Sequence, residues 1–471
     1  MSLVTVKTGD VRQKNCCRNK EIEEMSLLDK THTTEAQQGN GIALLPLLIF
    51  LVLFIGTGSV LMMSGVSMAF YQLSATVAVI PGIMVALWMG RESFEEKITI
   101  FLKGAGDINI MTMCVIYLLA GGFAAVAKAV GGVDATVNMG LSLVPASLVL
   151  PGLFIIAAFV ATAMGTSMGT IAAIGPIAAG VAGHSDMSIA LLMGAVVGGA
   201  MFGDNLSMIS DTTIAATRTQ GCNMRDKFRM NLLIALPAAI VTIILYATTG
   251  STGAVANAGD WQFIKVLPYL AILGLAVAGV NVFIVLTTGI VFAGAVGLAT
   301  LPDYALLTFG QDIYSGFVGM HEILVLSILV GGLGELIRHN GGLTWLVRKI
   351  GDIAKRFSKT GESKKAGEFS IAALAALADG CIANNTVAII LSGGMAKEIA
   401  KRSGISAKRS ASLLDIFSCV VQGLVPYAAQ VLLAGSLAKV SPVDIAVSNW
   451  YCLILAFTGA AAIFLGKPSE R

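Results

Sequence analysis

The sequence predicts an all-α polytopic membrane protein with two inverted repeats, each of five transmembrane helices plus one re-entrant hairpin, and with broken helices at the midplane. The first observation is composition: 56% of the 471 residues are hydrophobic and 13% are charged, whereas about a quarter of a soluble protein is charged. The second is the recurrence of apolar runs of about 20 residues, the length that a membrane-spanning helix requires. The third is a set of motifs that the two halves share.

These observations also exclude several classes of protein. A β-barrel would show shorter segments of alternating polarity, and the low charge content argues against a soluble multidomain or nucleic-acid-binding protein. The sequence has no phosphate-binding loop of the GxxxxGK[ST] type and no metalloprotease histidine motif. We therefore expect no enzyme activity and no cofactor. The expected partners are the lipid bilayer and small ions or a small-molecule solute, and a homodimer is one assembly that the sequence allows.

The polar N-terminal segment, residues 1–40, is expected to be a cytoplasmic tail. It carries several Lys and Arg residues and no cleavable signal peptide, because the first apolar run begins near Ala43 and is long enough to span. Met25 is an alternative start to Met1. The first repeat is expected over residues 41–250 and the second, inverted repeat over residues 263–466.

Apolar runs predict ten transmembrane spans, and two further apolar stretches are interrupted near their middles. The spans are residues 43–63, 70–90, 109–128, 189–217, 231–250, 263–279, 281–300, 320–338, 410–438 and 447–466. The interrupted stretches are residues 141–182 and 369–400. Their interruptions indicate re-entrant hairpins rather than single crossings.

The distribution of Lys and Arg supports this topology. Four loops are rich in these residues: 91–103, 218–229, 348–365 and 397–409. Four others have neither: 131–140, 183–188, 251–260 and 441–447. Basic loops remain on the cytoplasmic side. If the two interrupted stretches are hairpins, the ten spans cross in alternating directions and all four basic loops lie on the cytoplasmic side. We therefore expect a protein of the inner membrane of the cell, with both termini in the cytoplasm.

Repeated glycine motifs relate the two halves. Gly121-Gly122-Phe123 is followed by Gly131-Gly132-Val133, and the same spacing separates a second pair of such motifs that begin at Gly331 and Gly341. Each pair precedes an interrupted stretch and then a long span with polar residues. A half with five crossings forces the other half to insert upside down, as in many secondary transporters. Chance similarity between Gly- and Ala-rich helices is the alternative.

The densest group of polar residues within an apolar run surrounds Asp204. Gly203 and Asn205 favour an unwound turn, and Asp204 and Asp211 would share one face of a continuous helix because they are seven residues apart. Hydroxyl groups nearby add oxygen ligands for a hard cation such as Na⁺: Ser207, Ser210, Thr212 and Thr213. A carboxylate also binds a proton, so H⁺ and Na⁺ could compete for one site. The alternative is a solvated helix end near Arg218.

The tips of the two interrupted stretches carry further candidates. The first tip offers Thr166 and Ser167 between glycines, and the second offers the carboxylate Asp379. Three polar residues then open the second half of that stretch: Asn384, Asn385 and Thr386. The N-terminus of such a half-helix suits an anionic group, but an N-cap with no other role explains the same residues. Both interpretations remain open.

The long span of the second half repeats the polar pattern of the first. Asp415, Ser418, Gln422, Pro426 and Gln430 follow one another at near-helical spacing. Pro426 is expected to break the helix. Asp415 is either a site residue or a solvated residue near the cytoplasmic end.

At these motifs the chain resembles the NhaC-type Na⁺/H⁺ antiporter family. The similar runs are residues 165–170, 203–213 and 384–388, and the likeness extends over roughly residues 45–465. Two positions depart from the family pattern, since Asn205 stands where the resemblance implies Lys and Met208 where it implies Pro.

The resemblance implies Na⁺/H⁺ antiport by alternating access. Asp204 and Asp211 would bind the transported Na⁺, and Asp379 would complete the site from the other repeat. Hydroxyl groups would assist: Thr166, Ser167, Ser207 and Ser210. The alternative is a Na⁺- or H⁺-coupled permease or exchanger for an amino acid or small carboxylate, in which the two hairpin tips hold the organic group.

Overall fold

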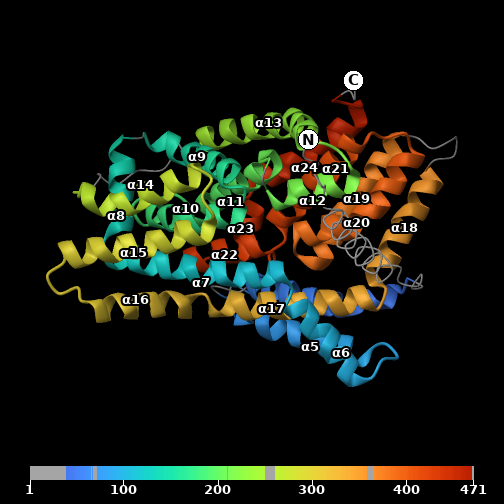
Figure 1. Cartoon of the computed structure of the whole chain (residues 1–471), viewed down its shortest axis with the longest axis horizontal. Helices are drawn as coiled ribbons and strands as arrows, with labels where there is room; N and C mark the ends of the chain where they lie inside the picture. Colours follow the sequence, from blue (N-terminus) through green and yellow to red (C-terminus); the bar gives the residue numbers. More distant parts are fainter. Residues whose placement is uncertain are drawn as a thin grey trace, which may run out of the picture.

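The structure is a computed structural model that describes residues 39–64, 66, 72–143, 145–208, 210–249, 260–357 and 364–468. Every regular element in these ranges is a helix. Most helices run along the long axis of the molecule (Figure 1). The predicted tail, with Met25, lies outside the described residues except for Gly39 and Asn40.

The helices of the first half begin at η1. They are η1 Gly41–Leu44, α2 Leu45–Leu51, η2 Val52–Gly56, α3 Thr57–Met63, α5 Ala75–Trp88, α6 Phe94–Ala105, α7 Ile108–Ala129, α8 Gly132–Leu143, η3 Ala146–Leu148, α9 Val149–Met164, α10 Ser167–Gly183, α11 Ile189–Leu206, α12 Asp211–Gln220 and α13 Met224–Thr249. Those of the second half are α14 Phe263–Val277, α15 Val282–Thr300, α16 Leu306–Gly319, α17 His321–His339, α18 Gly342–Phe357, α19 Lys364–Ile382, α20 Asn385–Arg402, α21 Ala407–Leu424, α22 Ala429–Ala438, α23 Pro442–Ser448 and α24 Trp450–Leu465.

The described residues contain enough long apolar helices for a multi-pass membrane protein. Six are long and apolar enough to cross a membrane, and eight if the bent pairs α16–α17 and α23–α24 each count as one span. Each of these eight overlaps a predicted span, but the predicted span 320–338 covers α17 and leaves α16 out. The two remaining predicted spans correspond to α5 and α14, which have 14 and 15 residues and are shorter than the ~20 residues of a typical crossing.

Polar side chains fix where many of these helices begin. The Ser93 side chain accepts a hydrogen bond from the backbone N–H of Glu96, and the Glu96 side chain accepts one in return, which is a capping box. Other helices start at a residue whose side chain accepts from the first turn: Asp107, Thr166, Ser210, Asn281, Asn384 and Ser406. Such caps satisfy amide groups that have no partner within the helix.

The predicted interruptions are present. The first stretch forms α9 and α10, and the second forms α19 and α20. The first pair begins at Val149 and not at residue 141, because residues 132–143 form the separate helix α8. The long spans also break, α11 from α12 and α21 from α22. In Figure 1, α9 and α10 lie in the left half and α19 and α20 in the right half.

The break between α11 and α12 lies later than the sequence predicted. Gly203 and Asn205 remain helical, and α11 ends only at Leu206. A Cβ at Gly203 would overlap with Ala161 of α9. This glycine therefore allows α11 to pack closely on α9, and it does not unwind the helix.

Packing between the halves is reciprocal. Helix α7 packs on α16 while α17 packs on α6, and α10 packs on α22 while α20 packs on α12. Glycines lie at the contact of α7 with α16 and at that of α6 with α17. A Cβ at Gly121 would overlap with the carbonyl oxygen of Gly316, and a Cβ at Gly104 would overlap with Glu335 and Gly331. The repeated Gly-Gly motifs therefore serve close helix contacts in both halves.

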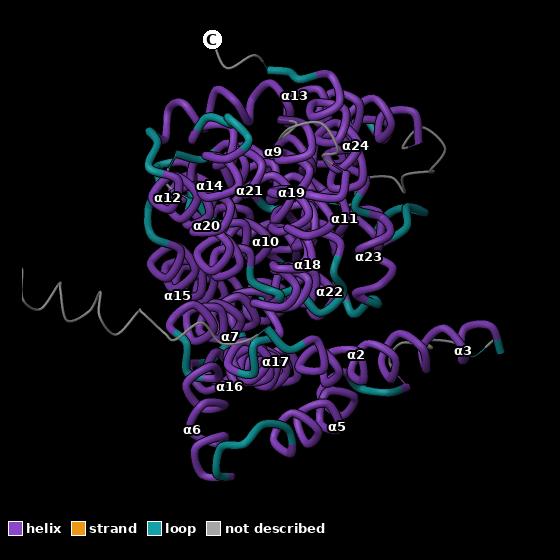
Figure 2. The backbone as a smooth tube through the Cα atoms, turned by 90° about the vertical axis from the view of Figure 1, so that its right-hand side faces the viewer, coloured by secondary structure: helices purple, strands orange, loops and turns teal. Residues whose placement is uncertain are grey.

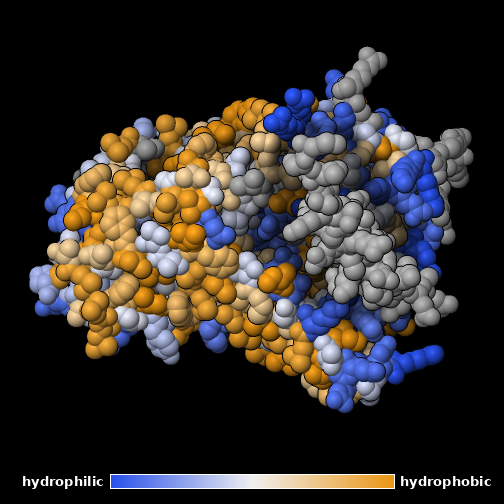
Figure 3. Space-filling view, viewed as in Figure 1, coloured by the Kyte–Doolittle hydropathy of each residue, from blue (hydrophilic) through white to orange (hydrophobic). Residues whose placement is uncertain are grey.

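The surface is divided along the long axis. Hydrophobic side chains dominate the left and middle of the view in Figure 3, and hydrophilic ones gather at the right-hand end, over α6 and α18. The predicted basic loop 91–103 and the described residues 348–357 of a second one fall in this region. In the view of Figure 2, which looks at that end, the segment from α2 to α3 extends to one side of the other helices.

Candidate functional site

Asp204 lies on the last turn of α11, where it faces the first hairpin turn. Its side chain is buried, with 4% of its surface exposed. The backbone N–H of Ser167, the first residue of α10, donates to Asp204 Oδ1 at 3.1 Å. The carboxylate is therefore held at the N-terminus of α10, where the helix dipole favours negative charge. No Lys or Arg of the described residues lies within ion-pair distance of Asp204.

The hydroxyl groups predicted to bind a cation close the break between α11 and α12. Ser210 Oγ donates to the backbone oxygen of Asp204 at 3.1 Å, and Thr212 Oγ1 to the same oxygen at 3.4 Å. Thr213 Oγ1 donates to the backbone oxygen of Ser207 at 2.7 Å. The backbone oxygens of Asp204 and Ser207 thus already accept hydrogen bonds from hydroxyl groups.

Asp211 lies apart from this buried group. It is the first residue of α12, and its side chain is exposed. The predicted shared face with Asp204 requires one continuous helix, and the break at residues 207–210 removes that relation. The prediction that both carboxylates lie on one helix face is therefore wrong.

A buried ion pair joins Lys227 of α13 to Asp415 of α21. Lys227 Nζ lies 2.9 Å from Asp415 Oδ2, and neither side chain has any exposed surface. The sequence predicts a basic loop over residues 218–229, but Lys227 lies in the first turn of α13 with its side chain buried, so it is not part of an exposed loop. Of the two interpretations of Asp415, the structure excludes the solvated one. The spacing of Lys227 and Asn231, one helical turn apart, is the sequence signal that could have revealed this face.

We call the three oxygens around Lys227 Nζ the ammonium cage. They are the backbone oxygen of Asn205 at 3.0 Å, Thr213 Oγ1 at 2.7 Å and Asp415 Oδ2 at 2.9 Å. Asp415 Oδ2 also accepts from Asn231 Nδ2 at 2.7 Å and from Asn205 Nδ2 at 3.2 Å. The positive charge that the resemblance led us to expect at position 205 thus comes from α13, next to Asn205.

Two buried glutamines connect the hairpin turns. Gln430 Nε2 donates to Ser167 Oγ at 3.1 Å, and Gln422 Nε2 donates to Gln430 Oε1 at 2.6 Å. Gln422 Nε2 also lies 3.1 Å from the backbone oxygen of Ala383, in the second turn. We call this chain of contacts the glutamine bridge. It runs from the start of α10 to the end of α19 and passes the break between α21 and α22.

The second hairpin carries a carboxylate without a partner. Asp379 of α19 is fully buried, and neither of its carboxylate oxygens has a hydrogen-bond partner among the described residues. The turn after it contains Ala383 in the left-handed region, with φ of 55°. A buried bare carboxylate is costly, which makes Asp379 a candidate site for a proton or a cation.

Asn384, the first of the polar residues at the start of α20, is the N-cap of that helix. Asn384 Oδ1 accepts from the backbone N–H of Val387 at 3.1 Å, so the capping interpretation is confirmed for Asn384. Its Nδ2 group is buried and has no partner in the described part of the chain. Asn385 Oδ1 accepts from the backbone N–H of Thr386 at 2.9 Å. Capping thus uses the amide oxygen of Asn384 and leaves its NH₂ group without a partner among the described residues.

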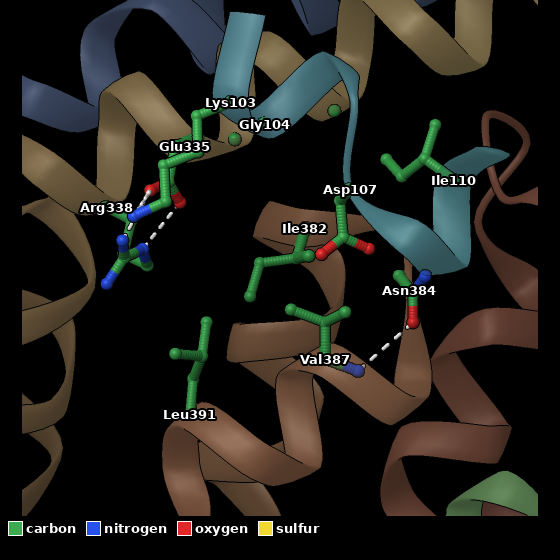
Figure 4. A pocket seen from close by; sticks show the side chains of 12 residues that line it. Lys103, Gly104, Asp107, Ile110, Glu335, Arg338, Ile382, Asn384, Val387 and Leu391 are labelled. Carbon is green, nitrogen blue, oxygen red and sulfur yellow. Dashed lines mark hydrogen bonds and ion pairs between the residues drawn. The ribbon is translucent and has the colours of Figure 1, made fainter. Parts of the chain in front are cut away.

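A pocket of about 230 Å³ lies between the second hairpin and helices α6, α7 and α17. Figure 4 shows Asp107 and Asn384 on one side of it and Glu335 and Arg338 on the other. Arg338 Nε donates to Glu335 Oε2 at 2.6 Å. The pocket therefore gives a small polar solute or a hydrated ion room beside the second hairpin turn.

Comparisons with known proteins agree with a transport function. Residues 15–251 match the profile described as the Na⁺/H⁺ antiporter family. The Na(+)/H(+) antiporter NhaC of Bacillus subtilis is 28% identical over 54% of this chain and 59% of its own length. The malate-2H(+)/Na(+)-lactate antiporter of the same organism is 26% identical over 46% of this chain and 53% of its own length. The chain thus spans between half and three fifths of these relatives.

Among solved structures, the chain is similar to MtrF of Neisseria gonorrhoeae, which is described with a class of antimetabolite efflux pumps. The match covers 90% of this chain and 95% of the MtrF chain. The sequence identity is 12% and the TM-score is 0.40. That TM-score is too low to establish a common fold.

Proposed function

This chain belongs to the Na⁺/H⁺ antiporter family, and we propose that it is itself a Na⁺/H⁺ antiporter that works by alternating access. The observation that carries the proposal is the buried carboxylate of Asp204, which has no Lys or Arg within ion-pair distance among the described residues. A buried carboxylate must be neutralised by a proton or a cation. If H⁺ and Na⁺ compete for that position, release of one accompanies binding of the other.

The proposed site has a main part and a complementary part. Asp204 binds the ion with help from Thr166 and Ser167 of the first hairpin turn. Asp379 supplies the second carboxylate from the other half of the chain. The glutamine bridge supports this assignment, since its hydrogen bonds connect Ser167 to Ala383, four residues after Asp379.

The residues near the α11–α12 break that the sequence predicts as ion ligands have other roles in this proposal. Ser207, Ser210 and Thr212 shape the break beside Asp204, and Asn205 positions the cage. Asp211 is exposed, and in this proposal it attracts Na⁺ toward the buried site. Three residues at the second hairpin turn, Asn384, Asn385 and Thr386, line the approach to Asp379.

The two halves act as inverted repeats in this proposal. The order hairpin, broken helix occurs in both halves, as α9–α10 with α11–α12 and as α19–α20 with α21–α22. Reciprocal packing of α10 on α22 and of α20 on α12 supports a twofold relation. The hairpins would enter from opposite faces of a cell's inner membrane, the second from the cytoplasmic face, with both termini in the cytoplasm.

Everted membrane vesicles that contain a pH-sensitive dye provide the test. A respiratory pH gradient is established, and NaCl is then added. We expect Na⁺ to dissipate the gradient in vesicles with the wild-type protein and not in vesicles without it. No dissipation between about pH 6 and 9, the range in which Na⁺ and H⁺ would compete, would reject Na⁺/H⁺ antiport.

Exchange of a small carboxylate coupled to Na⁺ or H⁺ is the second candidate. The pocket beside the second hairpin turn favours it, because it has room for a small solute between Asn384 and the side chains of α17. The similarity to the malate/lactate antiporter points to the same class of solute. Uptake of radiolabelled lactate or malate into proteoliposomes, driven by a Na⁺ gradient, would establish it, and Na⁺/H⁺ exchange without such uptake would reject it.

A further inference from the structure

All three N–H donors of the Lys227 ammonium group have an oxygen partner. A Lys ammonium has three N–H donors, and the cage offers three oxygens from three elements: the end of α11, α12 and α21. The distances are 3.0, 2.7 and 2.9 Å. The side chain has no exposed surface, so these oxygens replace all the water that an ammonium group would otherwise bind.

The cage also has the chemistry of a site for an alkali cation. A backbone carbonyl, a hydroxyl and a carboxylate oxygen are the hard ligands that such ions prefer. Asp415 supplies the negative charge, and its second oxygen, Oδ1, is buried without a hydrogen-bond partner among the described residues. Removal of the ammonium group would therefore leave an oxygen-lined, negatively charged position that requires one positive charge.

We propose that Lys227 is a tethered resident cation that closes the cage to Na⁺ and so removes Asp415 from the set of carboxylates that exchange ions. Asp204 and Asp379 then remain as the buried carboxylates of this central region without an ion-pair partner in the described ranges. The side chain thereby sets how many cations the protein moves in each cycle. This second part of the inference rests on the proposed Na⁺/H⁺ antiport, whereas the first part, occupancy of the cage, does not.

Occupancy of the cage is tested with purified protein in detergent. We expect Lys227→Ala to lower the Tm in choline chloride, because it leaves Asp415 unpaired, and NaCl to restore the Tm by about 3 °C or more beyond its effect on the wild type. Lys227→Arg keeps a cation in place, and the double variant K227A/D415N removes the charge that attracts Na⁺. Neither should show the additional gain in NaCl.

Arg409→Gln is the matched control. Arg409 and Glu368 form the other buried ion pair among the described residues, with a separation of 2.8 Å, and Glu368 Oε2 is the carboxylate oxygen to which Arg409 donates. This variant should lose Tm without a specific gain in NaCl, because the Arg409 guanidinium donates to one oxygen in the described part of the chain and its removal leaves no set of oxygens to hold Na⁺. Equal effects of NaCl and choline chloride on K227A would overturn the proposal. So would failure of K227A to fold in either salt if K227A/D415N folds.

The number of cations is tested by equilibrium binding of radioactive Na⁺ to the purified protein, because a carboxylate that takes Na⁺ one way and H⁺ the other adds no net charge to the cycle. We expect K227A to bind about one more Na⁺ per molecule than the wild type, and K227A/D415N to return to the wild-type number, because each unpaired buried carboxylate requires one cation. An unchanged number of bound Na⁺ in K227A would overturn this part. A wild type that does not exchange Na⁺ for H⁺ would reject the proposed function, while a specific gain of K227A in NaCl would still establish the cage.

Discussion

The two hairpin turns hold their carboxylates in different ways. At the first turn, Gly165 adopts the left-handed conformation with φ of 72°, and Asp204 from the neighbouring broken helix accepts the N–H of Ser167. At the second turn, Ala383 takes the left-handed position, and Asp379 lies within the hairpin itself without a partner. The halves share an order of elements, but each places its carboxylate on a different element.

The two carboxylates therefore differ in how strongly each one needs a bound proton or cation. A helix N-terminus and one hydrogen bond partly stabilise a charged Asp204. Nothing comparable faces Asp379 among the described residues, so this residue depends more strongly on a bound proton or cation. We expect the first turn to tolerate an empty site better than the second.

Removal of the Asp204 charge should have the largest effect. Asp204→Asn keeps the shape of the side chain but loses the carboxylate, and we expect Na⁺-dependent dissipation of the pH gradient to fall about 100-fold, as a loss of about 3 kcal/mol in ion binding predicts. Asp303→Asn removes an exposed charge between α15 and α16 and serves as the control. Equal losses in both variants would show that Asp204 has no special role.

Asp379→Asn should separate stability from transport. Because the asparagine removes a buried carboxylate without a partner, we expect the free energy of unfolding to rise by about 1–3 kcal/mol. Exchange should be lost at the same time, whereas Asp204→Asn should not gain stability. Thermal unfolding in Na⁺-free buffer measures the first effect. A destabilised D379N protein would contradict our comparison of the two turns.

The glutamine bridge should couple the two turns. Gln422→Met keeps the length of the side chain and removes its donors, which leaves the Ala383 and Gln430 acceptors unpaired at a cost of about 1–2 kcal/mol. Gln430→Met should cost a similar amount. In the double variant the losses should be clearly less than additive, because both single changes break one shared hydrogen bond. Strict additivity in denaturation would indicate that the bridge is not a connected unit.

The smallest effects concern the backbone of the two turns. Gly165→Ala places a Cβ in the left-handed region and should cost about 1 kcal/mol. Ala383→Gly relieves the same strain at the second turn, but glycine also raises the conformational entropy of the unfolded chain. The two effects oppose each other, so the free energy of unfolding should change by less than about 0.5 kcal/mol. Paired Tm measurements test this contrast. Equal and opposite shifts would show that unfolded-state freedom is negligible here.

Much of the fold could be predicted from the sequence, because apolar runs and basic loops report directly on the membrane. The interruptions near Gly165 and Pro426 were visible because glycine and proline have known backbone preferences. The role of Gly203 was not, since close packing against Ala161 depends on a neighbour 42 positions away in the sequence.

The candidate site was harder to predict. Asp204 stood out as a charge within an apolar run, and the structure buries it. The position of Asp211 could not be predicted from its spacing to Asp204, because residue spacing indicates a shared helix face only where the helix is continuous. Lys227 escaped notice because a lysine near the end of a span normally indicates a cytoplasmic loop, and only tertiary contacts reveal that its ammonium group faces Asp415.

The glutamine bridge consists wholly of uncharged groups: two amides, a hydroxyl and a backbone carbonyl. Such groups neither gain nor lose protons in the physiological range. A change in acidity on either side of the membrane therefore acts on the carboxylates and leaves the link between the turns intact. The distance between the two turns therefore stays the same when pH changes the protonation of Asp204 and Asp379.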